Sequence, residues 1–142
     1  MEVEALPTSI HLEIVTPDRQ VVRESVMAVP VPGKEGYLGI LPGHAPLLSL
    51  LQVGELSYIH ENVTHYVAVN WGFIEVLPDR VIILAQTAER AEEIDVDRAK
   101  RARQRAEERL GKVTAADVDF ERARAALSRA LARIHTADRT RI

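Results

Sequence analysis

The 142-residue chain contains no cysteine, which excludes disulfide bonds, thiolate metal sites and cysteine nucleophiles. It also lacks any run approaching the roughly 18 consecutive apolar residues that a membrane-spanning helix requires. The N-terminal segment has neither the basic nor the apolar region of a secretory signal peptide. Together these absences favour a soluble protein that faces a reducing, cytosolic compartment.

Proline is missing from the later part of the chain, because all seven prolines lie before residue 79. An alanine- and arginine-rich part follows, and the composition changes within the stretch from Glu89 to Ala99. We predict a hinge at residues 94–99 of this stretch. It is also a candidate site for an anion or a nucleotide.

Basic residues are scarce in the first part of the chain. Residues 1–85 hold four basic and ten acidic residues, whereas residues 86–142 hold 14 basic and 11 acidic residues. The formal net charge of −3 therefore hides a dipole between a half of charge −6 and a half of charge +3. The positive half is a candidate for binding an anionic partner, and the alternative is an ordinary solvated helical surface of mixed charge.

The proline-containing part has the sequence pattern of an all-β domain. Residues 10–15 alternate apolar and polar side chains, residues 16–20 suit a turn, and residues 21–29 are again rich in β-formers, which predicts a β-hairpin. Further strands are predicted at residues 37–40, 55–60, 64–69, 73–76 and 81–84, with an interruption at residues 70–72. Turn signals about every eight to twelve residues indicate a β-sandwich, or a flattened barrel, over residues 1–87. A parallel α/β sheet is not expected, since strands and helices do not alternate.

Three histidines in this part, His44, His60 and His65, are the residues to consider for catalysis or metal binding. None has an acidic residue at a recognisable ligand spacing, and the chain has no glycine-rich phosphate loop or serine elbow. We therefore predict no catalytic residue and no metal site. His44 is expected either to contact a partner or to be a hydrogen-bonded loop residue.

The alanine- and arginine-rich part is predicted to form two helices. Asp95 is a good N-cap, because its carboxylate can accept from the backbone N–H groups of Asp97 or Arg98. Alanine and leucine then recur at helical spacing, which predicts helices at about residues 96–110 and 115–135. Because the connection is short, the helices should pack as an antiparallel α-helical hairpin over residues 88–142.

The expected packing surface of this hairpin is mostly alanine. At about 0.8 kcal/mol for each buried methyl group and more for each leucine, the second helix gains on the order of 10 kcal/mol. Ordering its backbone costs a comparable free energy, at about 1 to 2 kcal/mol per residue. The hairpin is therefore expected to be poised between docked and released states.

Six arginines fall on shared faces of the two predicted helices, at steps of four and seven residues. They are Arg98, Arg105 and Arg109 on the first helix and Arg122, Arg129 and Arg133 on the second. In an antiparallel hairpin Arg98 should lie opposite Arg129 and Arg133, and Arg105 opposite Arg122. Such a cluster repels itself unless neighbouring glutamates form salt bridges with it, or a bound polyphosphate neutralises it.

Four stretches of the chain resemble the epsilon subunit of bacterial F-type ATP synthase. They are residues 39–48 (GILPGHAPLL), residues 72–76 (GFIEV), residues 85–95 (AQTAERAEEID) and the alanine-rich hairpin. The resemblance covers nearly the whole chain. It implies an N-terminal β-sandwich followed by a C-terminal helical hairpin, which agrees with the fold predicted from periodicity.

The resemblance implies a non-catalytic central-stalk subunit that couples rotation to the catalytic head. Its sandwich would bind the gamma subunit and the c-ring, with His44 in a loop near the rotor foot. The hairpin could extend and hold back ATP hydrolysis, with Arg122, Arg129 and Arg133 meeting an acidic segment of the catalytic beta subunit. Such a subunit would be peripheral, on the cytoplasmic side of the cell membrane, and attached only through the complex.

Some members of this family bind ATP through an Ile/Leu-Asp-x-x-Arg-Ala motif. Ile94, Asp95, Arg98 and Ala99 match its specified positions. The resemblance extends to Glu89 and Arg105, and to Arg129 and Arg133 if the interhelical connection is one residue longer than in those members. No cofactor is then required, but ATP is implied as a regulatory ligand.

Two interpretations from other classes compete with this one. A stand-alone helical hairpin that binds nucleic acid or another anion would use the same arginines, although interleaved acidic residues and few aromatic residues argue against nucleic acid. An enzyme built on His44 or His60 would lack an identifiable nucleophile or a partner that orients the base.

Overall fold

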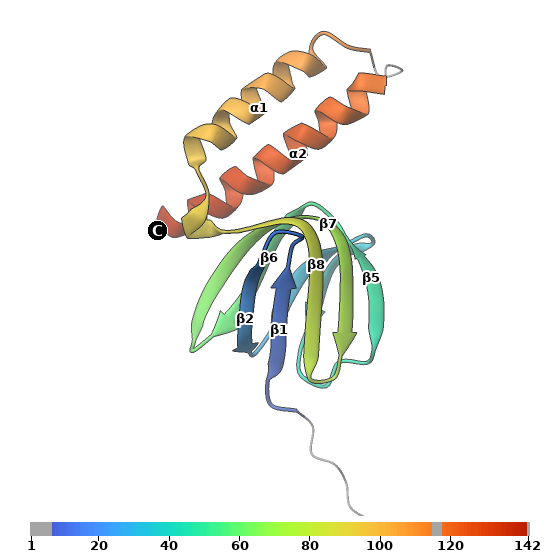
Figure 1. The fold of residues 1–142 in the computed structure, drawn as a ribbon, viewed down its shortest axis with the longest axis vertical. Coiled ribbons are helices and arrows are strands. Elements are labelled where there is room, and N and C mark those ends of the chain that lie inside the picture. The colour runs from blue at the N-terminus through green and yellow to red at the C-terminus, as the bar shows by residue number, and fades with distance from the viewer. Residues whose placement is uncertain (1–6, 115–117, 142) are drawn as a thin grey trace, which may run out of the picture.

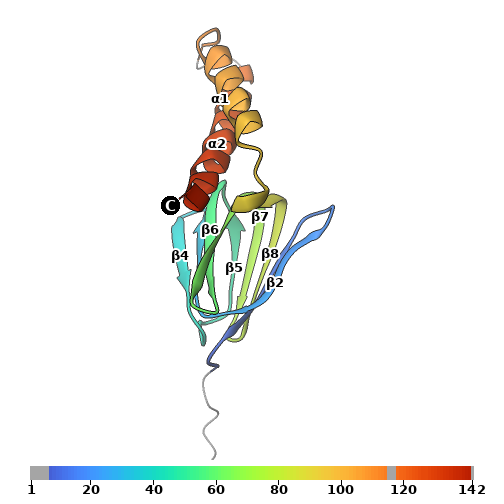
Figure 2. The same ribbon diagram turned by 90° about the vertical axis from the view of Figure 1, so that its left-hand side faces the viewer.

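The computed structural model describes residues 7–114 and 118–141, which form a β-sandwich with a helical hairpin standing on one end of it (Figure 1). This arrangement confirms the predicted fold class. Figure 2 shows the hairpin in line with the long axis of the molecule, above the ends of the strands. In the described part of the chain, neither helix is long and apolar enough to cross a membrane.

The sandwich is built from eight strands in one continuous hydrogen-bonded sheet that folds over itself. They are β1 (Ile10–Val15), β2 (Gln20–Val26), β3 (Val29–Gly33), β4 (Gly36–Ile40), β5 (Leu47–Leu51), β6 (Gly54–His60), β7 (Val63–Leu77) and β8 (Arg80–Arg90). The strand order is β2-β1-β8-β7-β5-β3-β4, and β6 pairs with β7 off this path. All pairs are antiparallel except β1 with β8.

Strands β3 and β5 lie in proline-containing stretches that were not predicted to be separate strands. Proline lacks an N–H donor, but its carbonyl can still accept a hydrogen bond. Pro32 does so, because its oxygen accepts from the backbone N–H of Gln52 at 2.9 Å. The prolines therefore limit the pairing of β3 without preventing it.

The predicted interruption at residues 70–72 is wrong, because β7 runs unbroken for 15 residues. β6 pairs with β7 as far as Val69, and β5 pairs with it from Gly72 onward. Residues 70–72 are thus the corner at which β7 passes from one layer to the other. Gly72 has φ +156°, and a Cβ there would lie 1.8 Å from the carbonyl oxygen of Leu84, so only glycine fits this corner.

Strand β8 is also longer than predicted. It was expected to end at residue 84, but it continues to Arg90 because β7 supplies partners for its second half. Glu89 consequently lies on the sheet, paired with Ala68. The strand passes the predicted domain boundary at residue 87, and the change of direction falls at the 3-10 turn η1 (Ala91–Glu93).

The sandwich interior consists of large aliphatic side chains that alternate along the strands. The most deeply buried are Ile10, Leu12, Ile14, Val29, Val31, Leu56, Val67, Ile74, Val76, Val81 and Ile83, all with 0% exposure. Because alternate residues of a strand point to the same face, the period-2 pattern of β1 fixes which side chains enter this core.

The hairpin consists of α1 (Val96–Leu110) and α2 (Val118–Asp138), followed by the 3-10 turn η2 (Arg139–Arg141). The bounds of α1 match the prediction, and Asp95 caps it by accepting from the Arg98 N–H at 3.0 Å. α2 ends at residue 138, three residues later than predicted, while its predicted start near residue 115 lies outside the described residues. Among the described residues of α1 and α2, the buried apolar residues are all alanines: Ala99, Ala106, Ala123, Ala130 and Ala137.

The end of α2 is attached to the sandwich by a small cluster of contacts. Ala137 packs with Ala68 and Ile94. Arg139 Nη2 lies 3.1 Å from Glu55 Oε1, and its guanidinium carbon lies 5.0 Å from the centre of the Tyr66 ring. The hairpin is thus anchored at its base, and its far end extends away from the sheet (Figure 1).

Candidate functional site

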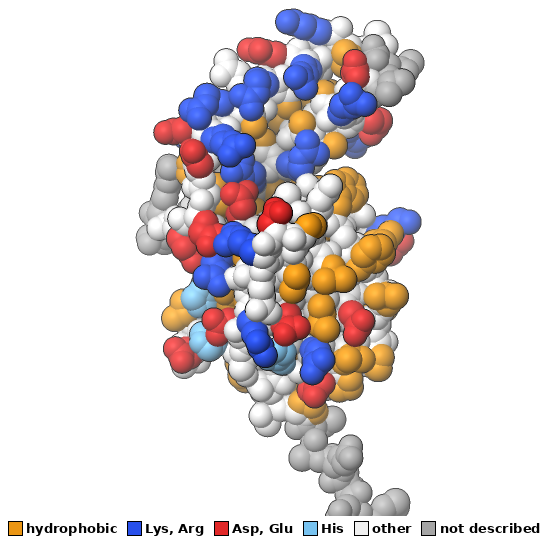
Figure 3. Space-filling model, in the orientation of Figure 1, with side chains coloured by type: hydrophobic (Ala, Val, Ile, Leu, Met, Phe, Trp, Pro, Cys, Tyr) orange, Lys and Arg blue, Asp and Glu red, His pale blue; other side chains and the backbone are white. Residues whose placement is uncertain are grey.

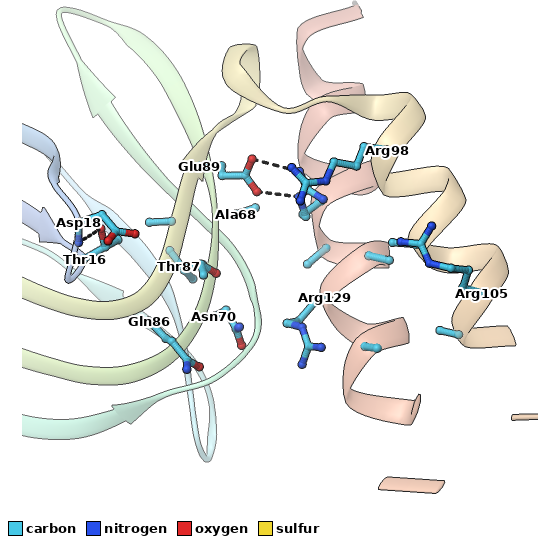
Figure 4. A pocket seen from close by; sticks show the side chains of 18 of the residues that line it. Thr16, Asp18, Ala68, Asn70, Gln86, Thr87, Glu89, Arg98, Arg105 and Arg129 are labelled. Atoms are coloured by element: carbon cyan, nitrogen blue, oxygen red, sulfur yellow. Dashed lines mark hydrogen bonds and ion pairs between the residues drawn. The ribbon is translucent and has the colours of Figure 1, made fainter. Parts of the chain in front are cut away.

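A cleft of about 740 Å³ separates the hairpin from the top of the sandwich. One wall is formed by α1 and α2, and the other by β7, β8 and the loop between β1 and β2. Figure 4 shows Arg98, Arg105 and Arg129 on the helical wall, with Asn70, Gln86 and Thr87 on the strand wall. The volume is typical of sites that hold a small organic ligand.

Arginine dominates the charge of this cleft. The helices supply Arg98, Arg105, Arg109, Arg129 and Arg133, and the loop after β1 supplies Arg19. The acidic residues in the lining are Asp18 and Glu89. Because guanidinium groups remain protonated at all physiological pH values, the cleft carries an excess of positive charge.

Glu89 and Arg133 form a bidentate ion pair across the cleft. Arg133 Nε donates to Glu89 Oε1 at 2.6 Å, and Nη2 donates to Oε2 at 3.2 Å. The side chains are 31% and 21% exposed, so the pair is only partly solvated. This pair connects strand β8 directly to α2 and uses the carboxylate of Glu89.

The other helical arginines of the cleft have no such partner. Within the described residues, the ion pairs leave Arg98, Arg105, Arg109 and Arg129 without a carboxylate. Surface salt bridges therefore do not neutralise these four arginines. Arg103 does have such a salt bridge, because its Nε lies 3.9 Å from Glu107. Four unpaired guanidinium groups around one cleft suit an anion with several oxygen atoms.

The predicted ATP-motif residues divide into two groups in the structure. Glu89, Arg98, Arg105, Arg129 and Arg133 line the cleft. The remaining three, Ile94, Asp95 and Ala99, are absent from its lining: Ile94 packs below α2, Asp95 caps α1, and Ala99 is fully buried. These three fix the position of α1 and, with it, the position of Arg98.

Arg122, which was predicted to lie opposite Arg105 in the hairpin and to contact a partner, is not among the residues that line the cleft. Its side chain is 78% exposed and lies 4.0 Å from Asp119. Arg122 sits near the start of α2, at the end of the hairpin farthest from the sandwich (Figure 1). The arginine-bearing face of the hairpin therefore extends past the part that lies opposite the sandwich.

Apart from Glu89, sequence reasoning missed the sandwich wall of the cleft. Arg19 belongs to a predicted turn, and it is held in place by Glu93, whose Oε2 accepts from Arg19 Nη2 at 2.7 Å. This hydrogen bond is the main reason why the pKa of Glu93 is lowered from its ordinary value. Asn70, Gln86 and Thr87 come from strands, and no local sequence signal shows that these strands face the hairpin.

The histidines lie elsewhere. His44 is in the loop at the opposite end of the sandwich, where its Nδ1 donates to the Ala45 carbonyl at 2.7 Å, as expected for a hydrogen-bonded loop residue. His60 donates to the Ser25 carbonyl at 2.9 Å, and this hydrogen bond is the main cause of its raised pKa. Among the described residues no group of three or more His, Asp or Glu side chains could hold a metal ion.

A second surface feature is an apolar face on the outside of the sandwich. Figure 3 shows hydrophobic side chains gathered over β5, β7 and β8, while basic side chains cover the hairpin. The exposed members are Leu48, Leu50, Trp71, Phe73 and Leu84, and each of these residues is 40% to 71% exposed to solvent. Contiguous apolar surface of this kind commonly marks a protein interface.

Comparison with known proteins identifies relatives of both parts of the chain. The family model of the ATP synthase delta/epsilon chain β-sandwich domain matches residues 9–91, and that of the long α-helix domain matches residues 92–138. The chain is 50% identical over 130 residues to ATP synthase epsilon chain 2 of Syntrophotalea carbinolica, covering 92% of this chain and 94% of that protein. It is 53% identical over 126 residues to the ATP synthase epsilon chain of Nitratidesulfovibrio vulgaris, covering 89% and 93%.

A solved structure supports the same relationship. A chain in the Euglena gracilis mitochondrial ATP synthase, determined as an OSCP/F1/c-ring assembly, superposes with a TM-score of 0.76 at 26% identity. The superposition covers 88% of this chain and 79% of that chain.

Proposed function

The chain belongs to the epsilon-chain family of ATP synthase, and from this premise we propose that it is a non-catalytic central-stalk subunit whose hairpin regulates ATP hydrolysis. The observation that carries this proposal is the pairing of a firmly packed sandwich with a hairpin that packs through alanines. The first part suits permanent assembly into a rotor, and the second suits reversible movement.

The apolar face is the proposed docking surface for the gamma subunit. Leu48, Phe73 and Leu84 are each more than half exposed in the isolated chain, which is costly unless a partner covers them. The loop that carries His44 lies at the far end from the hairpin, next to Leu41, which is 61% exposed. We assign this end to the c-ring, so that the subunit is held at the cytoplasmic side of the membrane only through the complex.

The hairpin is the proposed inhibitory element. When released from the sandwich it would extend toward the catalytic head, where Arg122, Arg129 and Arg133 would meet an acidic segment of the beta subunit. Release would require breaking the Glu89–Arg133 pair and the contacts of Arg139. Within the described part of α2 no large buried side chain opposes that movement, since the buried apolar residues there are alanines.

ATP is the proposed ligand of the cleft. Arg98, Arg105, Arg129 and Arg133 would bind the phosphates, Glu89 would contact the nucleoside or orient Arg133, and Ile94, Asp95 and Ala99 would hold α1 in position. A ligand that binds only the docked hairpin stabilises it by about 2.7 kcal/mol at a hundredfold excess over Kd. ATP would therefore favour the docked, permissive state over the extended, inhibitory state.

The inhibitory role is tested by removing the hairpin after Arg90 and assembling the truncated subunit into the complex. ATP hydrolysis should rise, because the sandwich retains its interfaces while the inhibitory element is lost. Unchanged hydrolysis with normal assembly would rule out the inhibitory role.

The ligand is tested by calorimetric titration of the full-length subunit with ATP. The wild type should bind, R105A should bind at least about tenfold more weakly because it loses a charge-assisted contact, and R103A should bind normally because Arg103 lies outside the cleft. If the wild type gives no heat of binding at millimolar ATP, the nucleotide proposal is ruled out, while the proposed rotor role is unaffected.

A further inference from the structure

One arginine of the cleft has no role in the proposed ATP site. Arg109 lies in the last turn of α1, lines the cleft, and has no carboxylate partner among the described residues. The residues assigned to ATP include Arg98 and Arg105 of the same helix but not Arg109. A basic residue in the last turn of a helix also interacts favourably with the helix dipole, which is the structural alternative for Arg109.

Arg98, Arg105 and Arg109 form a row along the cleft side of α1. They are seven and four residues apart, so a helix with 3.6 residues per turn places them on nearly the same side. At a rise of about 1.5 Å per residue the row extends over about 16 Å. All three arginines line the cleft, which therefore follows α1 for most of its length.

This row is longer than the phosphate chain of ATP. The three phosphorus atoms of a triphosphate lie within less than half of a span of about 16 Å. Guanidinium groups repel one another, so side chains that are exposed and unpaired stay spread along the helix. A triphosphate placed between Arg98 and Arg105 therefore leaves the charge of Arg109 without a counter-ion.

The helical wall of the cleft carries positive charge alone in the described part of the chain. The lining residues of α1 and α2 are arginines and alanines, and they include Arg129 (Figure 4). The acidic lining residues, Asp18 and Glu89, belong to the sandwich wall, and Glu89 is paired with Arg133. A chain of negative charges that lies along the helices thus meets no like charge on them.

We propose that the cleft binds linear inorganic polyphosphate, with the chain running along α1 from Arg98 to Arg109. This inference deepens the proposed ATP site, on which it rests, since both ligands would share Arg98, Arg105 and Arg129. Each unit of polyphosphate carries negative charge and exposed oxygen atoms, so successive units pair with successive guanidinium groups. A chain that contacts both helices requires the closed hairpin, and polyphosphate would therefore stabilise the docked state.

Nucleic acid, which is also a chain of phosphates, fits the cleft less well. Proteins that bind single strands stack the bases on aromatic side chains. The lining contains no Phe, Tyr or Trp among the described residues. Inorganic polyphosphate has no bases, so arginines alone can bind it.

The test measures, by calorimetry at physiological ionic strength, the affinity of the full-length subunit for ATP, inorganic tripolyphosphate and an inorganic polyphosphate long enough to span the row. The wild type should bind the long chain at least about fivefold more tightly than tripolyphosphate, because it gains a charge-assisted contact with an exposed arginine. In R109A the affinity for the long chain should fall by about fivefold, while the affinities for ATP and tripolyphosphate stay unchanged.

The matched control is R101A. Arg101 is another exposed arginine of α1 without a carboxylate partner among the described residues, but it does not line the cleft. This variant should bind all three ligands like the wild type. An equal loss of long-chain affinity in R101A and R109A would mean non-specific attraction to a positive helix and would refute the proposal.

Two further results would refute it. One is a wild type that binds the long chain no more tightly than tripolyphosphate. The other is an R109A variant that keeps the wild-type ratio of these two affinities, which is the result expected if Arg109 only stabilises the end of α1. Binding of ATP without any preference for the long chain removes this inference alone, whereas binding of the long chain without ATP removes the proposed ATP ligand alone.

Discussion

The sandwich and the hairpin bury different kinds of side chain. In the sandwich, isoleucine, leucine and valine from both layers are removed completely from solvent. Where the structure describes the hairpin, the buried apolar positions of its helices are alanines, joined by one buried hydroxyl residue, Thr136. A fully buried isoleucine contributes about 1.5 to 3 kcal/mol, compared with about 0.8 kcal/mol for a methyl group. The same chain therefore contains a fixed frame and a loosely held element.

This difference gives polar contacts more weight in the hairpin than in the sandwich. A few ion pairs, such as Glu89–Arg133, or a bound anion can shift an equilibrium that apolar burial leaves nearly balanced. In the sandwich the same contacts would change little, since apolar packing already dominates. Substitutions in the sandwich and in the hairpin test this difference.

The largest effect is expected for I83A in the sandwich core. Ile83 is fully buried, and its truncation leaves a cavity between the layers. The free energy of unfolding should fall by about 3 kcal/mol. Urea unfolding followed by circular dichroism measures this change.

The matched hairpin variant is L131A, because Leu131 is the exposed large apolar residue of α2, at 46% exposure. This substitution should change the free energy of unfolding by no more than about 0.5 kcal/mol. Equal losses in the two variants would contradict the division into frame and movable element.

An intermediate effect is expected for E89Q, which weakens the contact between β8 and α2. Arg133 would keep a hydrogen-bond acceptor but lose its counter-charge in a partly buried position. Docking of α2 should weaken by about 1.5 kcal/mol, so its most protected amides should exchange hydrogen about tenfold faster.

The control for this variant is E92Q, which alters a nearby exposed glutamate in η1. Amides of β1 should be unaffected in both variants. Accelerated exchange throughout the sandwich in E89Q would mean that Glu89 supports the whole fold and not the docking of the hairpin.

A smaller effect than that of E89Q concerns the pH dependence of the Arg19–Glu93 contact. Since the folded-state pKa of Glu93 is lowered from 4.5, the contact contributes stability above pH 4.5 and loses it as the pH falls through the folded-state pKa. Both side chains are at least 36% exposed, so this contribution should be below about 1 kcal/mol. Unfolding free energies measured from pH 7 down to pH 3 should decline less in E93Q than in the wild type. Identical curves would show that Glu93 titrates alike in the folded and unfolded states.

Features determined by neighbouring residues could be predicted from the sequence. The alternation of residues 10–15 located β1, and the cap formed by Asp95 gave the start of α1 to the residue. Both depend on contacts within a few positions along the chain.

Features determined by distant pairing could not be predicted in this way. The corner at Gly72 depends on how close Leu84 comes to it, and the length of β8 depends on partners in β7. The helical wall of the cleft was predictable because arginines at helical spacing share a face. Apart from Glu89, its sandwich wall was not, because Asn70 and Arg19 face the hairpin across the cleft only through the three-dimensional arrangement of strands.

The parallel pairing of β1 with β8 has a consequence for how the chain folds during synthesis. His11 is in register with Arg80, so the first strand has no partner on that side until most of the chain has left the ribosome. Long-range pairing of this kind slows folding, whereas the hairpin forms from contacts close in sequence. Until β8 emerges, β1 keeps an unpaired edge and carries the apolar side chains of Ile10, Leu12 and Ile14, so the nascent chain is prone to aggregation during this interval.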